Sequence, residues 1–174
     1  MKRLFCIAAL LAATAAVADP SAGRALTLTS LMRTDEFLAN AATDGVRRAQ
    51  PDGKVRDAAH VCAEQIDRAR FTAVVAKLFA ERLSVDELDQ AIEFYRTEAG
   101  KKYTRRIFDR TAGKPAEQLT TGEQMRINQF SQSASGRKLL TSAVLEDAEE
   151  VRTTTVAAIN DALLKCAGEP VAPK

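Results

Sequence analysis

The sequence predicts an all-α fold: a helical bundle of six to eight helices that contains two repeated helix–corner–helix units. Apolar residues recur at helical spacing along most of the chain, and the strict alternation typical of strands is nearly absent. Residues 80–107 also align without a gap to residues 116–143, with seven identities in 28 positions. Average residue usage gives roughly two identities by chance, so the match indicates an internal repeat.

Residues 1–18 are typical of a secretory signal peptide. A charged start at residues 2–3 precedes an apolar stretch at 4–15 and a small-residue cleavage site between Ala18 and Asp19. The apolar stretch is shorter than the about 20 residues that span a bilayer, which favours cleavage over a permanent anchor. We therefore expect a periplasmic protein with one helical domain at 19–168, a flexible tail at 169–174 and no transmembrane segment after processing.

The charge balance changes with processing. The whole chain has 25 basic and 23 acidic residues, and Lys2 and Arg3 leave with the signal peptide. The mature chain is formally neutral, so its charge gives no support to a nucleic-acid partner.

Two cysteines, Cys62 and Cys166, remain after processing. An even number of cysteines in an oxidising compartment predicts one disulfide, which closes a loop of about 100 residues and contributes roughly 4–5 kcal/mol in the chain-entropy treatment. The alternative is two unrelated buried thiols. Because there is no Cys-x-x-Cys pair, a thiol redox role is disfavoured.

The first helices follow from caps and turn residues. A short helix is predicted at 23–32, and a second begins at the N-cap Asp35 and ends at the turn residues 51–53. The apolar pattern resumes at Val55 and continues to Leu83. The sequence leaves open whether this segment is one long helix or two helices with a bend near Arg70.

Each repeat unit opens with a capping box, at residues 84–87 and 120–123. Each box begins a helix of about three turns, which ends near Arg96 in the first unit and near Gln132 in the second. The inner stripe of the first helix is Leu88, Ala91, Ile92 and Tyr95. Asn128 replaces Ile92 in the second unit, so that unit is packed less fully or faces something polar.

A corner follows each capped helix, with Thr97 and Ser133 as N-caps of the next helices. Glycine in a first helical turn costs about 1 kcal/mol relative to alanine, so its recurrence three residues later indicates a structural requirement. Either a close backbone approach or a left-handed helix cap meets that requirement. The predicted corner motif comprises Phe94, Thr97, Gly100 and Lys102 in the first unit, and Phe130, Ser133, Gly136 and Lys138 in the second.

The last predicted element is one long helical stretch from about Gly136 to Cys166. Gly168 and Pro170 end it.

The segments 83–88 and 94–102 resemble a family of exported bacterial proteins known as domain of unknown function 2059. In that family a capping phrase is followed by Phe-Tyr, a hydroxyl residue, often a proline, and Gly-x-Lys. Here Glu98 stands where proline is common. The resemblance implies an all-helical fold and a periplasmic address. The family has no assigned activity, so no catalytic residues carry over.

The sequence predicts no catalytic, cofactor or metal site. The single histidine, His60, lies two residues from Cys62, so on a helix the two side chains point to different faces. No nucleophile or phosphate-loop motif is present. The glutamates Glu87 and Glu123 are assigned entirely to capping.

A basic stretch at 101–114 has two interpretations. In the first interpretation it is an anion-binding strip, formed by Lys102, Arg105, Arg106 and Arg110. Alternatively, it is a solvated face paired with acidic residues at 86–93 or 146–150, which is the favoured interpretation because charge runs are usually solvated surface.

These observations predict a non-catalytic binding or interaction module whose partner is a protein or a component of the cell envelope. Two alternatives stay open. One is an enzyme with a carboxylate or lysine site in a groove between the repeat units. The other is an envelope-surface binder that uses residues 101–114.

Overall fold

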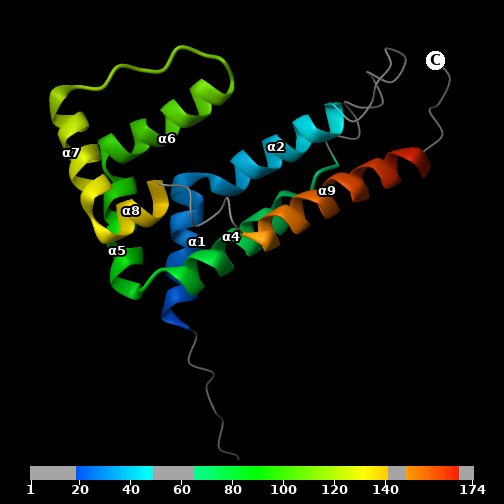
Figure 1. The fold of residues 1–174 in the computed structure, drawn as a ribbon, viewed down its shortest axis with the longest axis horizontal. Helices are drawn as coiled ribbons and strands as arrows, with labels where there is room; N and C mark the ends of the chain where they lie inside the picture. Colours follow the sequence, from blue (N-terminus) through cyan, green and yellow to red (C-terminus); the bar gives the residue numbers. More distant parts are fainter. Residues whose placement is uncertain (1–18, 49–64, 141–147, 169–174) are drawn as a thin grey trace, which may run out of the picture.

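The computed structural model describes residues 19–48, 65–140 and 148–168, without the side chains of 47–48 and 166–168. Every regular element in these ranges is a helix, which confirms the all-α prediction. The elements are α1 (Pro20–Met32), α2 (Thr34–Arg48), α4 (Arg68–Arg82), α5 (Val85–Arg96), α6 (Glu98–Thr111), α7 (Thr121–Gln132), α8 (Ala134–Leu140) and α9 (Glu149–Gly168) (Figure 1). None of the described helices is long and apolar enough to cross a membrane.

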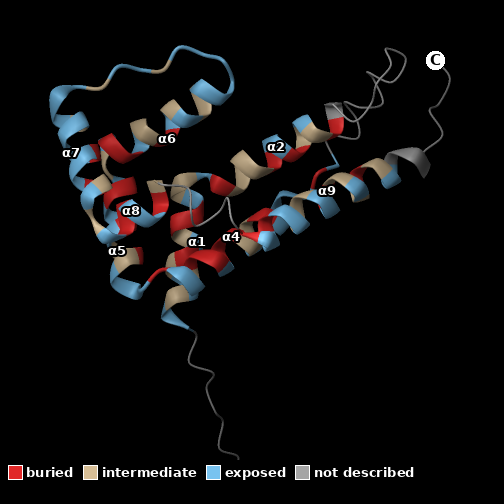
Figure 2. Cartoon of the chain, viewed as in Figure 1, coloured by how far each residue is buried: buried red, intermediate tan, exposed pale blue. Residues whose placement is uncertain are grey.

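The helices form two lobes that meet at α1 and α4 (Figure 1). The corner lobe consists of α5–α8, and the arm consists of α2, α4 and α9. The core of the corner lobe joins α1 and the end of α4 to both repeat units (Figure 2). Its buried residues are Ala25, Leu28, Val75, Ala76, Phe79, Leu83, Leu88, Ala91, Ile92, Phe94, Tyr95, Ala99, Ile127, Phe130 and Leu139.

The arm has a separate core made largely of small residues. Ala39, Ala42, Val46, Ile66, Phe71, Ala158 and Ala162 form its main cluster, and Leu78, Ala148 and Val151 form a smaller one. Ion pairs join Arg70 to Asp161 and Lys77 to Glu150, so α4 and α9 run antiparallel. Small side chains allow a close approach: a Cβ added to Gly45 of α2 would lie 2.9 Å from a side-chain carbon of Ile159.

The junction between α1 and α2 corrects the predicted N-cap. Arg33 has a left-handed backbone with φ of 54°, and its N–H donates to carbonyl groups at the end of α1. This conformation ends α1 and lets α2 begin at Thr34, so Asp35 lies inside the first turn. Its carboxylate accepts a hydrogen bond from the Thr72 hydroxyl of α4 at 2.8 Å instead.

The sequence leaves open whether the apolar segment between 55 and 83 is one helix or two with a bend near Arg70. In the structure a new helix begins just before Arg70. Residues 65–67 are not helical, and the Asp67 carboxylate caps a new helix by accepting from the Ala69 N–H at 3.0 Å. The helix that ends at Arg82 therefore begins at Arg68. The predicted turn at 51–53 and His60 lie outside the described residues.

The prediction of one long helix from about Gly136 to Cys166 is wrong. Helix α8 ends at Leu140, Ala148 is not helical, and α9 begins at Glu149. The two helices have different neighbours, because α8 packs against α5 in the corner lobe and α9 packs against α2 and α4 in the arm. One straight helix cannot pack against the neighbours of both α8 and α9.

The predictions for the chain ends and for the disulfide concern residues outside the described ranges. These are the signal peptide at 1–18, the tail at 169–174, Cys62, and the side chain of Cys166. They stay predictions from the sequence.

Candidate functional site

Both predicted capping boxes are present, with the same geometry. In α5 the Ser84 hydroxyl accepts from the Glu87 N–H at 3.2 Å, and the Glu87 carboxylate accepts from the Ser84 N–H at 2.8 Å. In α7, Thr120 and Glu123 make the same two bonds at the same distances. The caps leave α5 ending at Arg96 and α7 ending at Gln132, as the sequence predicts.

A single residue forms each corner. Thr97 is both the last cap of α5 and the first cap of α6: its hydroxyl donates to the Phe94 carbonyl at 2.7 Å and accepts from the Gly100 N–H at 3.1 Å. Ser133 does the same between α7 and α8, with distances of 2.7 Å to Phe130 and 3.0 Å to Gly136. The chain thus passes from one helix to the next without a loop.

A close approach of the backbone explains why glycine recurs at the two corners. A Cβ added to Gly100 would lie 2.6 Å from the Cα of Tyr95, and one added to Gly136 would lie 3.0 Å from the Cα of Ser131. In both cases it would come closer still to a carbonyl oxygen. Among the described glycines only Gly113 has a positive φ, so the alternative of a left-handed cap does not apply to the corners.

The two corners exchange ion pairs. Lys102 of the first corner lies 2.9 Å from the Glu123 carboxylate, and Lys138 of the second lies 2.7 Å from Glu87. Each corner lysine therefore binds the capping glutamate of the other unit. This reciprocity is the pattern that two subunits make across a two-fold axis. Glu87 and Glu123 have this second role beside capping, which corrects their assignment to capping alone.

Two phenylalanines at matching positions of the units lie in contact, and a tyrosine of the first unit packs beside them. Phe94 and Phe130 stack with ring centroids 4.0 Å apart and planes at 6°, and Tyr95 packs edge-on against both. The interface between the units is therefore filled by rings and bridged by ion pairs. The duplication itself stays an inference from the sequence, and the structure adds contacts at matching positions.

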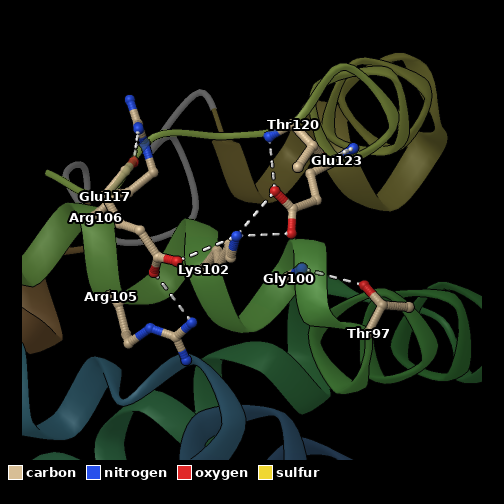
Figure 3. Close-up of polar contacts among 8 residues, drawn as sticks. All are labelled: Thr97, Gly100, Lys102, Arg105, Arg106, Glu117, Thr120 and Glu123. Carbon is tan, nitrogen blue, oxygen red and sulfur yellow. Dashed lines mark hydrogen bonds and ion pairs between the residues drawn. The ribbon is translucent and has the colours of Figure 1, made fainter.

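Glu117 contacts three residues of the basic stretch (Figure 3). Its carboxylate lies 3.1 Å from Lys102 and 3.3 Å from Arg105, and its carbonyl oxygen accepts from the Arg106 guanidinium. These contacts hold the segment between α6 and α7 against α6. Glu117 was not among the residues predicted for a site, although its identity with Glu81 in the repeat was a usable signal.

The expected partners of the basic stretch were acidic residues at 86–93 or 146–150, and this expectation is wrong for Lys102 and Arg105. Their carboxylate partners are Glu123 of α7 and Glu117 of the segment between α6 and α7, because the fold places that segment beside α6. Arg110 is exposed. Binding of an external anion by Lys102, Arg105, Arg106 and Arg110 stays a prediction.

The corner carboxylates and Lys102 are held in their charged forms. The backbone N–H of Thr120, and then Lys102, lower the pKa of Glu123. Lys138, and then the backbone N–H of Ser84, lower that of Glu87. Hydrogen bonds from Lys102 to the two glutamates raise the lysine pKa. Acid–base catalysis works best with a pKa near the operating pH, and all these shifts lead away from neutrality.

A cleft of about 620 Å³ lies between α2 and α6, and we call it the α2–α6 cleft. Phe37 and Phe108 meet edge-on in it with centroids 6.3 Å apart, and the Arg33 guanidinium lies 4.3 Å from the centre of the Phe108 ring. Its polar lining residues are Arg33, Asn40, Thr43, Asp44, Asp109, Thr111 and Lys114. Its volume is in the range of small-molecule pockets.

A second hollow, also about 620 Å³, lies between α4 and α9. Small or apolar side chains line its middle, namely Ala73, Val74, Thr153, Thr154 and Ala157. Arg70 and Lys77, which pair with α9, lie toward its two ends. This hollow is a groove along two antiparallel helices.

Two hydroxyl groups in the corner lobe have no hydrogen-bond partner, although they are buried. They belong to Tyr95 and Thr104. Burial raises the pKa of Tyr95 far above its ordinary value, so this phenol stays protonated. In the part of the chain that the structure describes, no group of three or more histidine, cysteine or acidic residues is placed to hold a metal ion.

Residues 69–106 match the model of a family described as an uncharacterized protein conserved in bacteria, domain of unknown function 2059. This confirms the predicted resemblance over α4, α5 and the first part of α6, which include the first corner. No curated protein and no solved structure matches the chain.

Proposed function

We propose that this protein is an exported, non-catalytic binding module of the cell envelope, and that its partner is a peptide segment of an envelope protein. The observation that carries the proposal is the α2–α6 cleft. It joins an aromatic floor to polar groups from two helices of different lobes.

The lining of the cleft suits a peptide. Phe37 and Phe108 offer an apolar surface for one or two side chains. Asn40, Thr43 and Thr111 supply amide and hydroxyl groups that can bond to a peptide backbone. Basic and acidic residues share the rim, so the cleft has no strong preference for one sign of ligand charge.

The corner electrostatics support binding over acid–base catalysis. Lys102 and the glutamates that surround it are a candidate carboxylate–lysine set between the repeat units, but their pKa values move apart. Such a set holds two helices together better than it transfers a proton. The stacked phenylalanines occupy the interface where the predicted groove would lie.

Site-specific photo-crosslinking in cells tests the proposal. A crosslinking residue at Asn40 or Thr111, on the rim of the cleft, should capture a partner that the same residue at the exposed Gln124 of α7 does not. Phe108→Ala should reduce the yield from Asn40 by about tenfold, because a peptide side chain loses its apolar contact. Phe108→Leu keeps the bulk of the floor and separates this effect from a change in folding.

Equal capture from Asn40 and Gln124, or capture that does not depend on Phe108, would count against the cleft as the binding site.

The predicted export to the periplasm and the predicted disulfide are tested separately. The mature protein isolated from the periplasmic fraction should begin at Asp19 by intact-mass measurement. Peptide mapping without reductant should link the peptides that contain Cys62 and Cys166. A mature chain that keeps residues 1–18, or free thiols at both cysteines, would contradict these expectations.

The envelope-surface alternative depends on the basic stretch. Vesicles of anionic lipid should retain the protein less when Arg105 and Arg106 are replaced, and less at high salt, if these residues bind the surface. Because both arginines contact Glu117, we expect no such dependence.

A further inference from the structure

Arg33 is an arginine in a backbone conformation that usually belongs to glycine. Its φ of 54° is left-handed, and among the residues that the structure describes it is the only non-glycine with a positive φ. Glycine has no Cβ and is therefore the usual residue at the left-handed cap of a helix. An arginine at this position indicates that its side chain has a role that glycine cannot take.

The Arg33 side chain connects two helices of different lobes. Its Nε and Nη2 atoms donate to the two carboxylate oxygens of Glu36, at 2.8 Å and 2.7 Å. Glu36 belongs to the first turn of α2, so these two bonds fix the plane of the guanidinium beside that helix. The same guanidinium lies over the Phe108 ring of α6, 4.3 Å from its centre.

Stability alone does not account for this arrangement. The side chains of Arg33 and Glu36 are 45% and 31% exposed, and an ion pair of this kind contributes little to the free energy of unfolding. A contact between a guanidinium and a ring is also weak at an exposed site. The left-handed backbone, in contrast, costs an arginine more than it costs a glycine. The arrangement is better explained by what it does to Phe108.

Phe108 is the residue that depends on this contact. It is half-buried in the last turn of α6 and meets Phe37 edge-on, with the ring planes at 90°. Helix α2 packs against α4 and α9, whereas α6 packs against α5 and α7. The two rings therefore meet at the boundary between the lobes, where the orientation of a half-buried ring depends on the few groups that touch it.

We propose that Arg33 is a positioning residue of the α2–α6 cleft: it holds the Phe108 ring beside Phe37, so that the apolar floor is formed before the partner binds. This inference rests on the proposed function, because the floor matters only if the cleft binds a ligand. A ring that is fixed in advance loses less conformational entropy on binding. The floor then receives an apolar side chain of the peptide, and Arg33 acts on the peptide only through Phe108.

Fluorine NMR of the purified protein tests the positioning without any partner. With para-fluorophenylalanine at position 108, Arg33→Gly should move the resonance toward its value in the urea-unfolded chain, because the ring is no longer held. The same label at Phe130, which stacks on Phe94 in the corner lobe, should keep its resonance. A resonance at position 108 that Arg33→Gly leaves in place would overturn the proposal.

Photo-crosslinking from Asn40 in cells tests the consequence for binding. Arg33→Gly should reduce capture about tenfold if the ring then has the binding orientation for about one-tenth of the time. Thermal unfolding of the same variant should show no loss of stability, because glycine fits the left-handed backbone. Capture that is lost while stability is kept is a result that a merely structural role would not give.

A double variant separates positioning from direct contact with the partner. If Arg33 acts only through Phe108, Arg33→Gly should reduce capture no further once Phe108→Ala is present. Additive losses would mean that Arg33 contacts the partner itself, and the positioning role would be wrong.

The chain contains a matched control for the ion pair. Glu149, in the first turn of α9, binds Nε and Nη2 of Arg152 in the same way, and neither residue lines the cleft. Glu36→Gln should lower capture from Asn40 and move the fluorine resonance, whereas Glu149→Gln should change neither. Equal effects of the two variants would also overturn the proposal.

These experiments separate the role of Arg33 from the proposed function. If the wild type captures no partner from Asn40, the proposed function fails, and the fluorine resonance still decides whether Arg33 positions the ring. If the wild type captures a partner and Arg33→Gly captures it equally well, the cleft is a binding site and only the role of Arg33 is wrong.

Discussion

The two helix–corner–helix units share their caps and corners but differ in what covers them. In unit 1 (α5 and α6) the residues Leu88, Ile92 and Tyr95 are buried in a core that includes Ala25 and Leu28 of α1. In unit 2 (α7 and α8) the equivalent residues are Gln124, Asn128 and Ser131. Gln124 and Asn128 are exposed and bond to each other at 3.0 Å. The positions that close the corner are kept, and the positions that face a neighbour change with that neighbour.

The exchanged ion pairs show the same contrast on a smaller scale. Lys102 is only 18% exposed and meets two carboxylates, whereas Lys138 is 45% exposed and meets one carboxylate and the Arg82 carbonyl. The residue that aligns with Glu117 before the first unit, Glu81, is on α4 and lies 3.8 Å from Lys77. The contact with the capping glutamate is common to both units, and the second contact depends on the segment that precedes each unit.

Exchanging the residues at the equivalent positions 92 and 128 should produce the largest difference in stability between the two units. Ile92→Asn should lower the free energy of unfolding by about 4 kcal/mol, because it leaves a cavity and a buried amide without a partner. Asn128→Ile, at the equivalent exposed position, should change it by less than about 0.5 kcal/mol. Urea denaturation measures both. Similar losses in the two variants would mean that α1 is not the cause of the difference.

Alanine substitutions at the corner glycines should have the next largest effect on stability. Gly100→Ala should cost about 3 kcal/mol, because the added Cβ overlaps backbone atoms of α5. Gly136→Ala should cost at least as much, because a Cβ there would come closer to the Phe130 carbonyl oxygen than one at Gly100 comes to the Phe94 carbonyl oxygen. Gly122→Ala is the matched control: a Cβ there meets nothing within 4 Å, and alanine is the better helix former. A destabilised Gly122→Ala variant would show that the corner geometry is not what distinguishes these glycines.

The corner hydroxyls should give equal effects in the two units. Thr97→Ala and Ser133→Ala each remove one cap with the same bonds, and each should cost about 1 kcal/mol. Thermal unfolding followed by circular dichroism measures this. Thr97→Ser should restore most of the loss, whereas failure to do so would point to the methyl group of Thr97 instead of its hydroxyl.

The exchanged ion pairs should give the smallest effects, and effects that depend on pH. The pKa values of Glu117 and Glu123 lie below their ordinary value of 4.5 in the folded chain. Their ionisation therefore stabilises the fold above about pH 4.5, and this contribution is lost as the pH falls through the lowered pKa.

Lys102→Met should weaken this acid dependence. Lys138→Met should weaken the corresponding contribution of Glu87, whose pKa Lys138 lowers, and by less because Lys138 is more exposed. Chemical denaturation at about pH 7 and about pH 3 measures the difference for each variant. An acid dependence that Lys102→Met leaves unchanged would contradict the assignment to this cluster.

Most of the local structure follows from the amino-acid sequence alone. Capping boxes, corner hydroxyls and helix ends at Arg96 and Gln132 follow from interactions within four residues, and these are written in the order of the amino acids. The recurrence of glycine indicated a requirement, although not which one. The periodicity also identified the buried stripe of α5, because an amphipathic helix buries its apolar face in nearly any bundle.

Which distant groups meet depends on how the helices pack together. Glu117 is ordinary in the sequence and becomes a centre of the basic stretch because the chain returns beside α6 after α6 ends. The break before Glu149 was missed because α8 and α9 share one periodic pattern and differ only in their neighbours. Long-range partners depend on how helices pack in space, and helical spacing describes one helix at a time.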